Sequence, residues 1–199
     1  QEAIRVGRLL VQLLPEPEAI GLLALMLLQE SRRATRTSPT GELVLLEHQD
    51  RSRWDRAVIA EGVELTTRAL KTRFFGPYCL QAAIAAVHAE APSAAATDWS
   101  EIIGLYDVLA RLDPSPVVAL NRAVAVAMRD GPAIALPIVK NLLPALSEYH
   151  LAHAVHADLC RRLGKKDEAL ASYRRALELA RQEPERRFLE RRIAELAAA

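Results

Sequence analysis

Apolar residues recur along most of the chain at the three- and four-residue spacing that places them on one face of an α-helix. No stretch of strand length alternates strictly between apolar and polar positions. Proline and short polar clusters, such as "PEPE" at 15–18 and "DPSP" at 113–116, divide the pattern into segments of helical length. The pattern therefore predicts an all-α fold made of antiparallel helical hairpins.

The segments between these breaks are the expected helices. They cover residues 3–14, 17–36, 52–73, 78–91, 98–112, 117–131, 132–146, 148–163, 166–182 and 185–197. Asp98 is expected to be an N-cap and Gly131 a C-cap, because these residue types satisfy free backbone groups at helix ends. Ser52 and Asp55 have the spacing of a capping box, which predicts a helix start inside "HQDRSRWDR" at 48–56.

The last third of the chain repeats itself. Ala123 and Ala157 lie 34 residues apart, and Gly131 and Gly164 lie 33 apart. A period of 34 residues is that of the tetratricopeptide repeat (TPR), a unit of two helices and a turn.

The second of these units carries the TPR pattern most clearly. Ala169, Tyr173 and Ala176 form a small–large–small seam along its second helix. The earlier unit, 121–143, matches only in its first helix and turn. We expect 113–199 to hold TPR-like repeats closed by a capping helix, "PERRFLERRIAEL", with inward-facing Phe188, Ile193 and Leu196. Residues 1–112 then form a preceding helical domain, unless the whole chain is one right-handed superhelical array.

Composition narrows the classes of protein. The chain of 199 residues is 51% hydrophobic but only 5% aromatic, and its formal net charge is +1. Its two cysteines, Cys79 and Cys160, do not make a disulfide framework and fit a reducing cytoplasm. The first residues do not read as a signal peptide, and the longest apolar run, 19–28, is too short to span a bilayer. A cytoplasmic protein without membrane contact is expected.

The catalytic and cofactor motifs that can be read from sequence do not occur in this chain. His156 and Cys160 are four residues apart, so they share a helix face, and both residue types can bind a metal ion. His150 and His153 lie nearby. A structural zinc ion needs four convergent ligands, and the sequence does not identify the others. We therefore expect no metal, no cofactor and no enzymatic activity, with these side chains packed or solvated.

Direct nucleic-acid binding is not expected either. Residues 161–195 contain 11 basic and 7 acidic residues, a modest excess of positive charge. The arginines alternate with glutamates, as on an ordinary solvated helix, although a basic end of this kind can also contact an acidic protein face.

Several long phrases resemble one known family in the same order. They are "EAIRVGRLLVQLLPEPEAIGLLALMLLQESRRATR", "GELVLLEHQDRSRWDR", "GPYCLQAAIAAVHAEA", "LYDVLARLDPSPVVALNRAVAVAMRDGP", "LCRRLGKKDEALASYRRALELA" and "ERRFLERRIAEL". Together they resemble the C-terminal helical, TPR-like extension of a group of bacterial extracytoplasmic-function (ECF) RNA polymerase sigma factors. The sigma domains that precede the extension in that group have no counterpart in this sequence, so we expect the chain to be a fragment.

The resemblance implies a regulatory, protein-binding module. Its expected partners are the sigma-factor domains of the same full-length protein or RNA polymerase, because the extension in that group takes the place of an anti-sigma partner. Two other functions stay open on the residues alone. One is a free-standing TPR adaptor that binds a peptide unrelated to transcription, and the other is a small-molecule sensor.

Three groups of residues are candidate protein contacts. The first is the mixed cluster of "HQDRSRWDR", which can also be only a capped helix start with solvated arginines. The second lies in "GPYCLQAAIAAVH", and the third is a polar pair in an apolar helix, where bonding to a neighbouring carbonyl is an equal alternative. The candidates are Asp50, Arg51, Trp54, Asp55, Arg56, Tyr78, Gln81, His88, Asn121 and Arg122.

Overall fold

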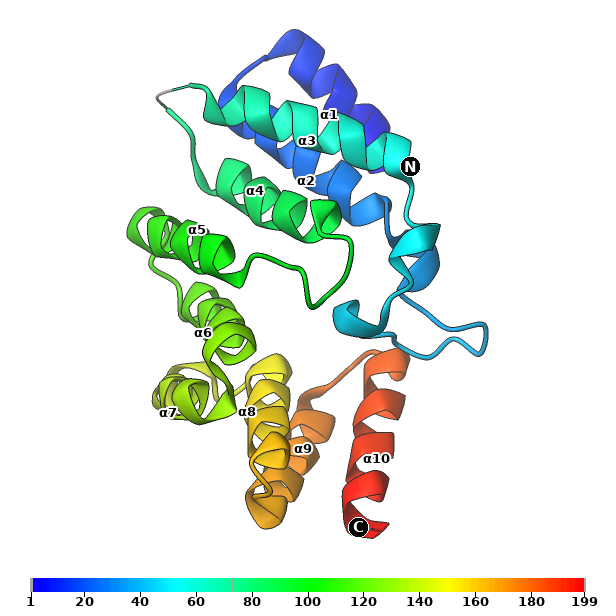
Figure 1. The fold of residues 1–199 in the computed structure, drawn as a ribbon, viewed down its shortest axis with the longest axis vertical. Helices are drawn as coiled ribbons and strands as arrows, with labels where there is room; N and C mark the ends of the chain where they lie inside the picture. The colour runs from blue at the N-terminus through cyan, green and yellow to red at the C-terminus, as the bar shows by residue number, and fades with distance from the viewer. Residues whose placement is uncertain (1, 73, 199) are drawn as a thin grey trace. The chain divides into compact units, whose positions relative to one another are not determined.

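The computed structural model describes residues 2–72 and 74–198, and it confirms the all-α prediction (Figure 1). No β-strand occurs among these residues. The α-helices are α1 (Glu2–Leu13), α2 (Pro17–Glu30), α3 (Arg56–Leu70), α4 (Pro77–Glu90), α5 (Trp99–Leu112), α6 (Pro116–Asp130), α7 (Pro132–Leu142), α8 (His150–Arg162), α9 (Lys166–Leu179) and α10 (Glu183–Ala198). Short 3₁₀ helices are η1 (Arg33–Thr35), η2 (Leu46–His48), η3 (Arg51–Arg53) and η4 (Leu143–Leu146).

The chain divides into two compact units. The first holds α1 to α5 and the second holds α6 to α10 together with the segment Pro39–Leu43. Within the first unit, α2 is the central helix and packs against α1, α3 and α4. This explains why α2 is apolar on most sides: it has neighbours around it, and Leu23, Leu27 and Leu28 are almost fully buried.

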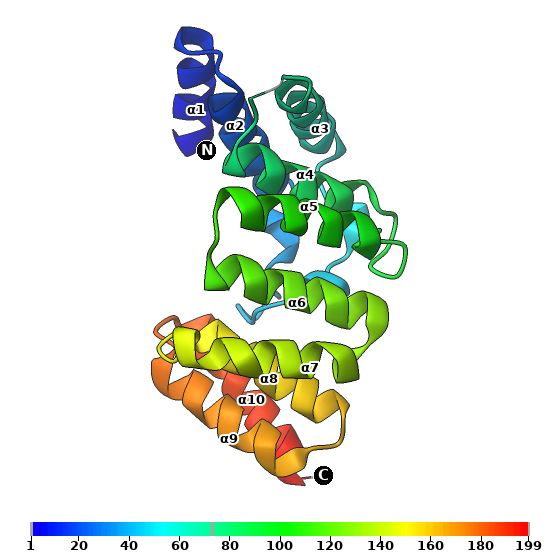
Figure 2. The ribbon, with the colours of Figure 1, turned by 90° about the vertical axis from the view of Figure 1, so that its left-hand side faces the viewer.

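In the second unit each helix packs against the next, and α8 contacts both α7 and α9 (Figure 2). The small residues of the repeat are fully buried, since Ala123 and Ala157 have no exposed surface. Ala135 and Ala169, also 34 residues apart, are equally buried. The earlier unit therefore keeps one small residue of the second-helix seam, whereas Val139 and Leu142 stand where the later unit has Tyr173 and Ala176.

The turns and the seam of the repeats are as predicted. Gly131 and Gly164 have φ of 93° and 72°, a left-handed region that favours glycine. Tyr173 is 1% exposed and lies in a cluster with Ala157 and Ala176. The predicted inward residues of α10 pack against that cluster; they are Phe188, Ile193 and Leu196. The terminal helix thus covers the open side of the last hairpin.

The start of α3 corrects the capping prediction. The helix begins at Arg56, because the Asp55 side chain accepts hydrogen bonds from the backbone N–H groups of residues 57 and 58. Asp50 accepts from the Ser52 N–H and caps the separate turn η3. Ser52 therefore caps no helix. Similarly, α2 ends at Glu30 rather than near Arg36, and η1 follows it. Asp98 is the N-cap of α5, as predicted.

A carboxylate of α2 holds the start of α4. Glu18 Oε1 accepts from the N–H groups of Gly76 at 3.0 Å and Cys79 at 3.2 Å, and Oε2 accepts from that of Tyr78 at 3.1 Å. A Cβ on Gly76 would lie 2.6 Å from Glu18 Cδ, so this approach requires glycine. The negative charge also faces the positive end of the α4 dipole.

We expect Glu18→Gln to lower the free energy of unfolding by about 1–2 kcal/mol, because charge-assisted capping bonds are lost. The control is Glu16→Gln, since Glu16 precedes α2 without a side-chain capping bond. Chemical denaturation followed by circular dichroism measures both variants. Equal effects of the two substitutions would contradict the capping role.

Among the described residues, no helix combines the length and the apolar character that crossing a bilayer requires.

Candidate functional site

Arg51 and Trp54, the centre of the predicted interaction cluster, are buried. Trp54 is 3% exposed and Arg51 is 7% exposed. The expectation of an exposed cluster is therefore wrong for these two side chains. Asp50, Asp55 and Arg56 are exposed, but the two aspartates cap helices and Arg56 donates to the Arg51 carbonyl at 3.1 Å. Whether any of these residues contacts a partner stays a prediction.

Arg51 ties the η3 turn to the end of α4. Its Nη1 donates to the carbonyls of His88 and, at 2.9 Å, Ala91, while Nη2 lies 3.5 Å from Thr97 Oγ1. The guanidinium carbon lies 4.8 Å from the centroid of the Trp54 ring, as a cation–π contact. These groups belong to segments about 40 residues apart, which no local sequence pattern connects.

Two more arginines lie after α2. Arg32 Nη2 and Arg36 Nη2 both donate to Gln29 Oε1, at 2.6 Å and 2.7 Å. Arg36 Nη2 also donates to the Gln29 carbonyl. Arg32, Arg36, Arg51 and His88 are hereafter called the basic cluster. Arg32 and Arg36 follow the end of α2, and His88 lies near the end of α4 (Figure 1). The whole cluster belongs to the first unit.

The basic cluster is electrostatically unfavourable. Burial, together with the charges of Arg36 and Arg51, lowers the pKa of Arg32 to about 10. Burial, followed by the charges of Arg32 and Arg51, lowers the pKa of His88 to about 4. Burial also lowers the pKa of Arg51. His88 is thus neutral at pH 7, and its Nδ1, like Arg36 Nε, is buried without a hydrogen-bond partner.

A second feature of the first unit is an apolar stripe on α1. Val6, Leu9, Leu10, Leu13 and Leu14 recur at helical spacing, and their exposed fractions run from 39% to 84%. The opposite side of α1 packs on α2. A Cβ on Gly7 would lie 2.6 Å from the tip of the Met26 side chain, and Val11 packs against buried Ile20. We call the exposed stripe the α1 face.

The α1 face was not predicted, although the sequence contains a signal for it. Residues 3–14 contain too many apolar positions for a single helical stripe. One stripe packs on α2, and a second stripe remains exposed. Such a contiguous apolar surface is typical of a protein contact.

The other candidate residues lie elsewhere. On α4, Tyr78 is 43% exposed and Gln81 is half-buried. On α6, Asn121 is exposed and Arg122 is half-buried. Asn121 and Arg122 therefore belong to the second unit, and the other eight candidates belong to the first.

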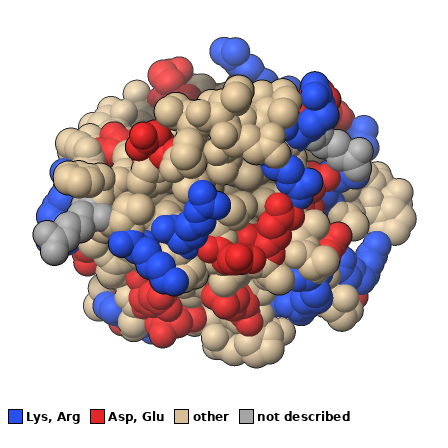
Figure 3. Space-filling model, turned by 90° about the horizontal axis from the view of Figure 1, so that it is seen from above, with Lys and Arg blue, Asp and Glu red and all other residues tan. Residues whose placement is uncertain are grey.

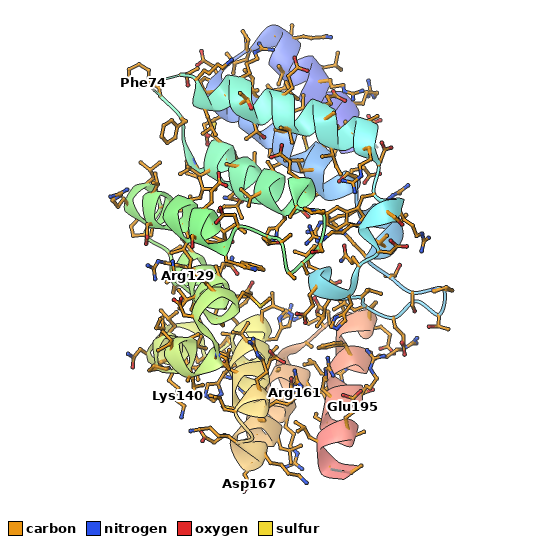
Figure 4. The ribbon with its side chains drawn as sticks, viewed as in Figure 1. Phe74, Arg129, Lys140, Arg161, Asp167 and Glu195 are labelled. Carbon is orange, nitrogen blue, oxygen red and sulfur yellow. The ribbon has the colours of Figure 1, made fainter. Side chains whose placement is uncertain are left out.

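Figure 3 shows one face of the molecule, on which acidic and basic side chains are intermingled. The basic C-terminal region is similar: Arg161 pairs with Asp158 at 2.6 Å, and Arg192 pairs with Glu195 at 2.9 Å. Figure 4 labels Arg161 on α8 and Glu195 on α10. These partly exposed pairs support the interpretation of this region as a solvated helical surface.

A potential metal-ligand group forms in the second unit. His156 Nε2 lies 3.7 Å from Cys160 Sγ, and Glu168 of α9 brings a carboxylate oxygen into a group of three ligand atoms within 4.8 Å of one another. Sequence spacing could not identify Glu168, because a turn separates it from α8. However, Lys140 and Lys165 bind this carboxylate at 2.7 Å and 3.1 Å. Two ammonium groups beside three ligands do not favour a divalent cation.

The cysteines do not have the environment of nucleophiles. Burial raises the pKa of Cys79 to about 11 and also raises that of Cys160. Both thiols are therefore protonated at neutral pH.

The hairpins and the buried small residues of the repeat place the protein in the class of TPR-like helical arrays. A crystal structure of TTC0263, a thermophilic TPR protein from Thermus thermophilus, is similar with a TM-score of 0.61 and 20% sequence identity. The match covers 99% of this chain and 90% of that chain. At this identity the likeness concerns the fold alone.

Two sequence comparisons give relatives of the chain. The model of a family of unknown function, DUF6596, matches residues 1–70, a range that includes the α1 face and three arginines of the basic cluster. The chain is 48% identical over 198 residues to "Uncharacterized protein R00370" of Rhizobium meliloti (strain 1021). The match covers 99% of this chain but 47% of the relative, so the chain spans about half the length of that protein.

Proposed function

We propose that the chain is the regulatory, protein-binding extension of a bacterial ECF sigma factor and acts in the cytoplasm on transcription initiation. In this proposal it binds the sigma domains of its own full-length protein, or RNA polymerase, and performs no covalent chemistry. It does not itself bind nucleic acid. The sequence resemblance supports this family, and the TPR-like fold is one that commonly presents surfaces to other proteins.

The α1 face is the observation that carries the proposed contact. Four large apolar side chains on α1, together with Leu14 directly after it, lie exposed at helical spacing. An apolar stripe of this kind is stabilised by docking against another protein. The Rhizobium relative has room for such a partner in the same polypeptide, because the region aligned with this chain is 47% of its length. We assign the α1 face to the sigma domains.

Transcription by the full-length protein with RNA polymerase tests this function. We expect deletion of the extension to change promoter-dependent transcription about tenfold, the size of a coupling free energy of about 1–3 kcal/mol. Leu13→Glu should reproduce the deletion, because Leu13 is 84% exposed and lies on the α1 face. Ile134→Glu is the control, since Ile134 is 55% exposed on α7. Unchanged transcription after deletion would refute the regulatory role.

The TPR likeness favours a second candidate, a free-standing adaptor that binds an unrelated peptide. The same assay separates the two functions, because an adaptor would leave sigma-dependent transcription unchanged.

A further inference from the structure

We propose that the basic cluster is a binding site for a phosphate-class oxyanion, either free phosphate or the phosphate group of a small ligand. The proposal goes beyond the regulatory function and rests on the contacts of Arg32, Arg36 and Arg51.

Among the described residues, the three arginines of the basic cluster lack a negatively charged partner. In the part of the chain that the structure describes, no ion pair joins Arg32, Arg36 or Arg51 to a carboxylate; their partners are neutral amide, carbonyl and hydroxyl oxygens. The neighbouring Arg33 does have one, Glu30, at 3.1 Å. These guanidinium groups are partly or fully buried and have no acidic partner. Their desolvation and their mutual repulsion are unfavourable, and a bound anion would offset both.

The hydrogen bonds at Gln29 also favour an anion in this place. Its side-chain oxygen accepts from two guanidinium groups at once, at 2.6 Å and 2.7 Å. An anionic oxygen at the position of the Gln29 oxygen would form charge-assisted hydrogen bonds with both groups. The neutral amide oxygen that lies there is a weaker acceptor. Arg36 Nε is buried and unpaired, so the cluster has a donor to spare.

The charge of the basic cluster and the shape of its guanidinium groups favour a phosphate-class anion. The guanidinium fork matches phosphate and carboxylate oxygens in two-point contacts. A single carboxylate would balance one of three positive charges, whereas phosphate near neutral pH balances between one and two and offers more acceptor oxygens. Arg32 and Arg36 share one acceptor. An anion with several oxygens could accept hydrogen bonds from both guanidinium groups.

Thermal unfolding and calorimetry of the whole chain in phosphate-free buffer test the proposal. Inorganic phosphate and glycerol phosphate are titrated separately, with chloride at equal ionic strength as the reference. We expect one or both phosphate compounds to raise the unfolding midpoint more than chloride does. A response to inorganic phosphate identifies the free ion, and a response to glycerol phosphate alone identifies a phosphate group on a ligand.

Matched variants locate the site. Arg36→Gln is expected to weaken phosphate binding at least tenfold, and Arg33→Gln, one turn away in an exposed ion pair, should leave it unchanged. Gln29→Glu places a carboxylate between Arg32 and Arg36, so it should raise the midpoint without phosphate and abolish the response. Gln29→Glu keeps the test valid if Arg36→Gln does not fold. A wild-type response no larger than that to chloride, or a full response in Gln29→Glu, overturns the proposal.

Discussion

Trp54→Ala is expected to lower the free energy of unfolding by about 3–5 kcal/mol, the usual cost of truncating a large buried aromatic side chain. Trp54 is 3% exposed and packs in one cluster with Leu28 of α2, Ile59 of α3 and Ala86 of α4. Its Nε1 also donates to Thr35 Oγ1 at 2.9 Å. The substitution therefore removes the side chain at which three helices and the η1 turn meet.

Trp54→Phe separates packing from hydrogen bonding. The phenyl ring keeps most of the apolar contact and the ring beneath Arg51, so we expect a loss of only about 1–2 kcal/mol. Denaturant unfolding followed by circular dichroism measures both variants, since it does not depend on tryptophan fluorescence. A cost below about 1 kcal/mol for Trp54→Ala would contradict the packing of this side chain between the three helices.

The second large effect is a dependence of stability on His88 ionisation. The folded-state pKa of His88 is about 4, whereas an unfolded histidine titrates near its ordinary value of 6.5. Below pH 6.5 the unfolded chain therefore binds a proton that the folded chain does not. The contribution of His88 to the free energy of unfolding is complete above about pH 6.5. It is lost as the pH decreases to about 4, which lowers the free energy of unfolding by about 3 kcal/mol in total.

His88→Gln removes this contribution, because glutamine does not titrate. The difference in unfolding free energy between about pH 7 and about pH 4 should therefore be about 3 kcal/mol smaller in the variant than in the wild type. His48→Gln is the control, since the His48 side chain is 64% exposed. Identical pH profiles for wild type and His88→Gln would show that His88 protonates as freely in the folded chain as in the unfolded one.

Local signals predicted the fold well. The caps at Asp98 and Gly131 and the seam through Ala169 and Tyr173 depend on residues within one or two turns, so the sequence pattern shows them directly. The helix start near Ser52 was wrong because two aspartates each cap a different turn of this segment. Asp55 caps α3, and Asp50 caps a turn of its own.

The candidate site was harder to predict because its contacts are distant in sequence. Arg51 is buried only because carbonyl groups 37 and 40 residues further along accept its hydrogen bonds. A charged stretch such as "HQDRSRWDR" carries no local sign of such partners. Likewise, the Gln29 amide accepts hydrogen bonds from both Arg32 and Arg36. This contact indicates an anion site only because no carboxylate pairs with these arginines among the described residues, and the sequence does not show that.

The affinity of this chain for the separately produced sigma domains is the most direct test of the proposed function. Isothermal titration calorimetry should show a one-to-one complex, and Leu13→Glu should weaken its dissociation constant at least tenfold while Ile134→Glu does not. If the wild-type chain binds neither the sigma domains nor RNA polymerase, or if Leu13→Glu binds as tightly as the wild type, the α1 face does not have the role proposed for it.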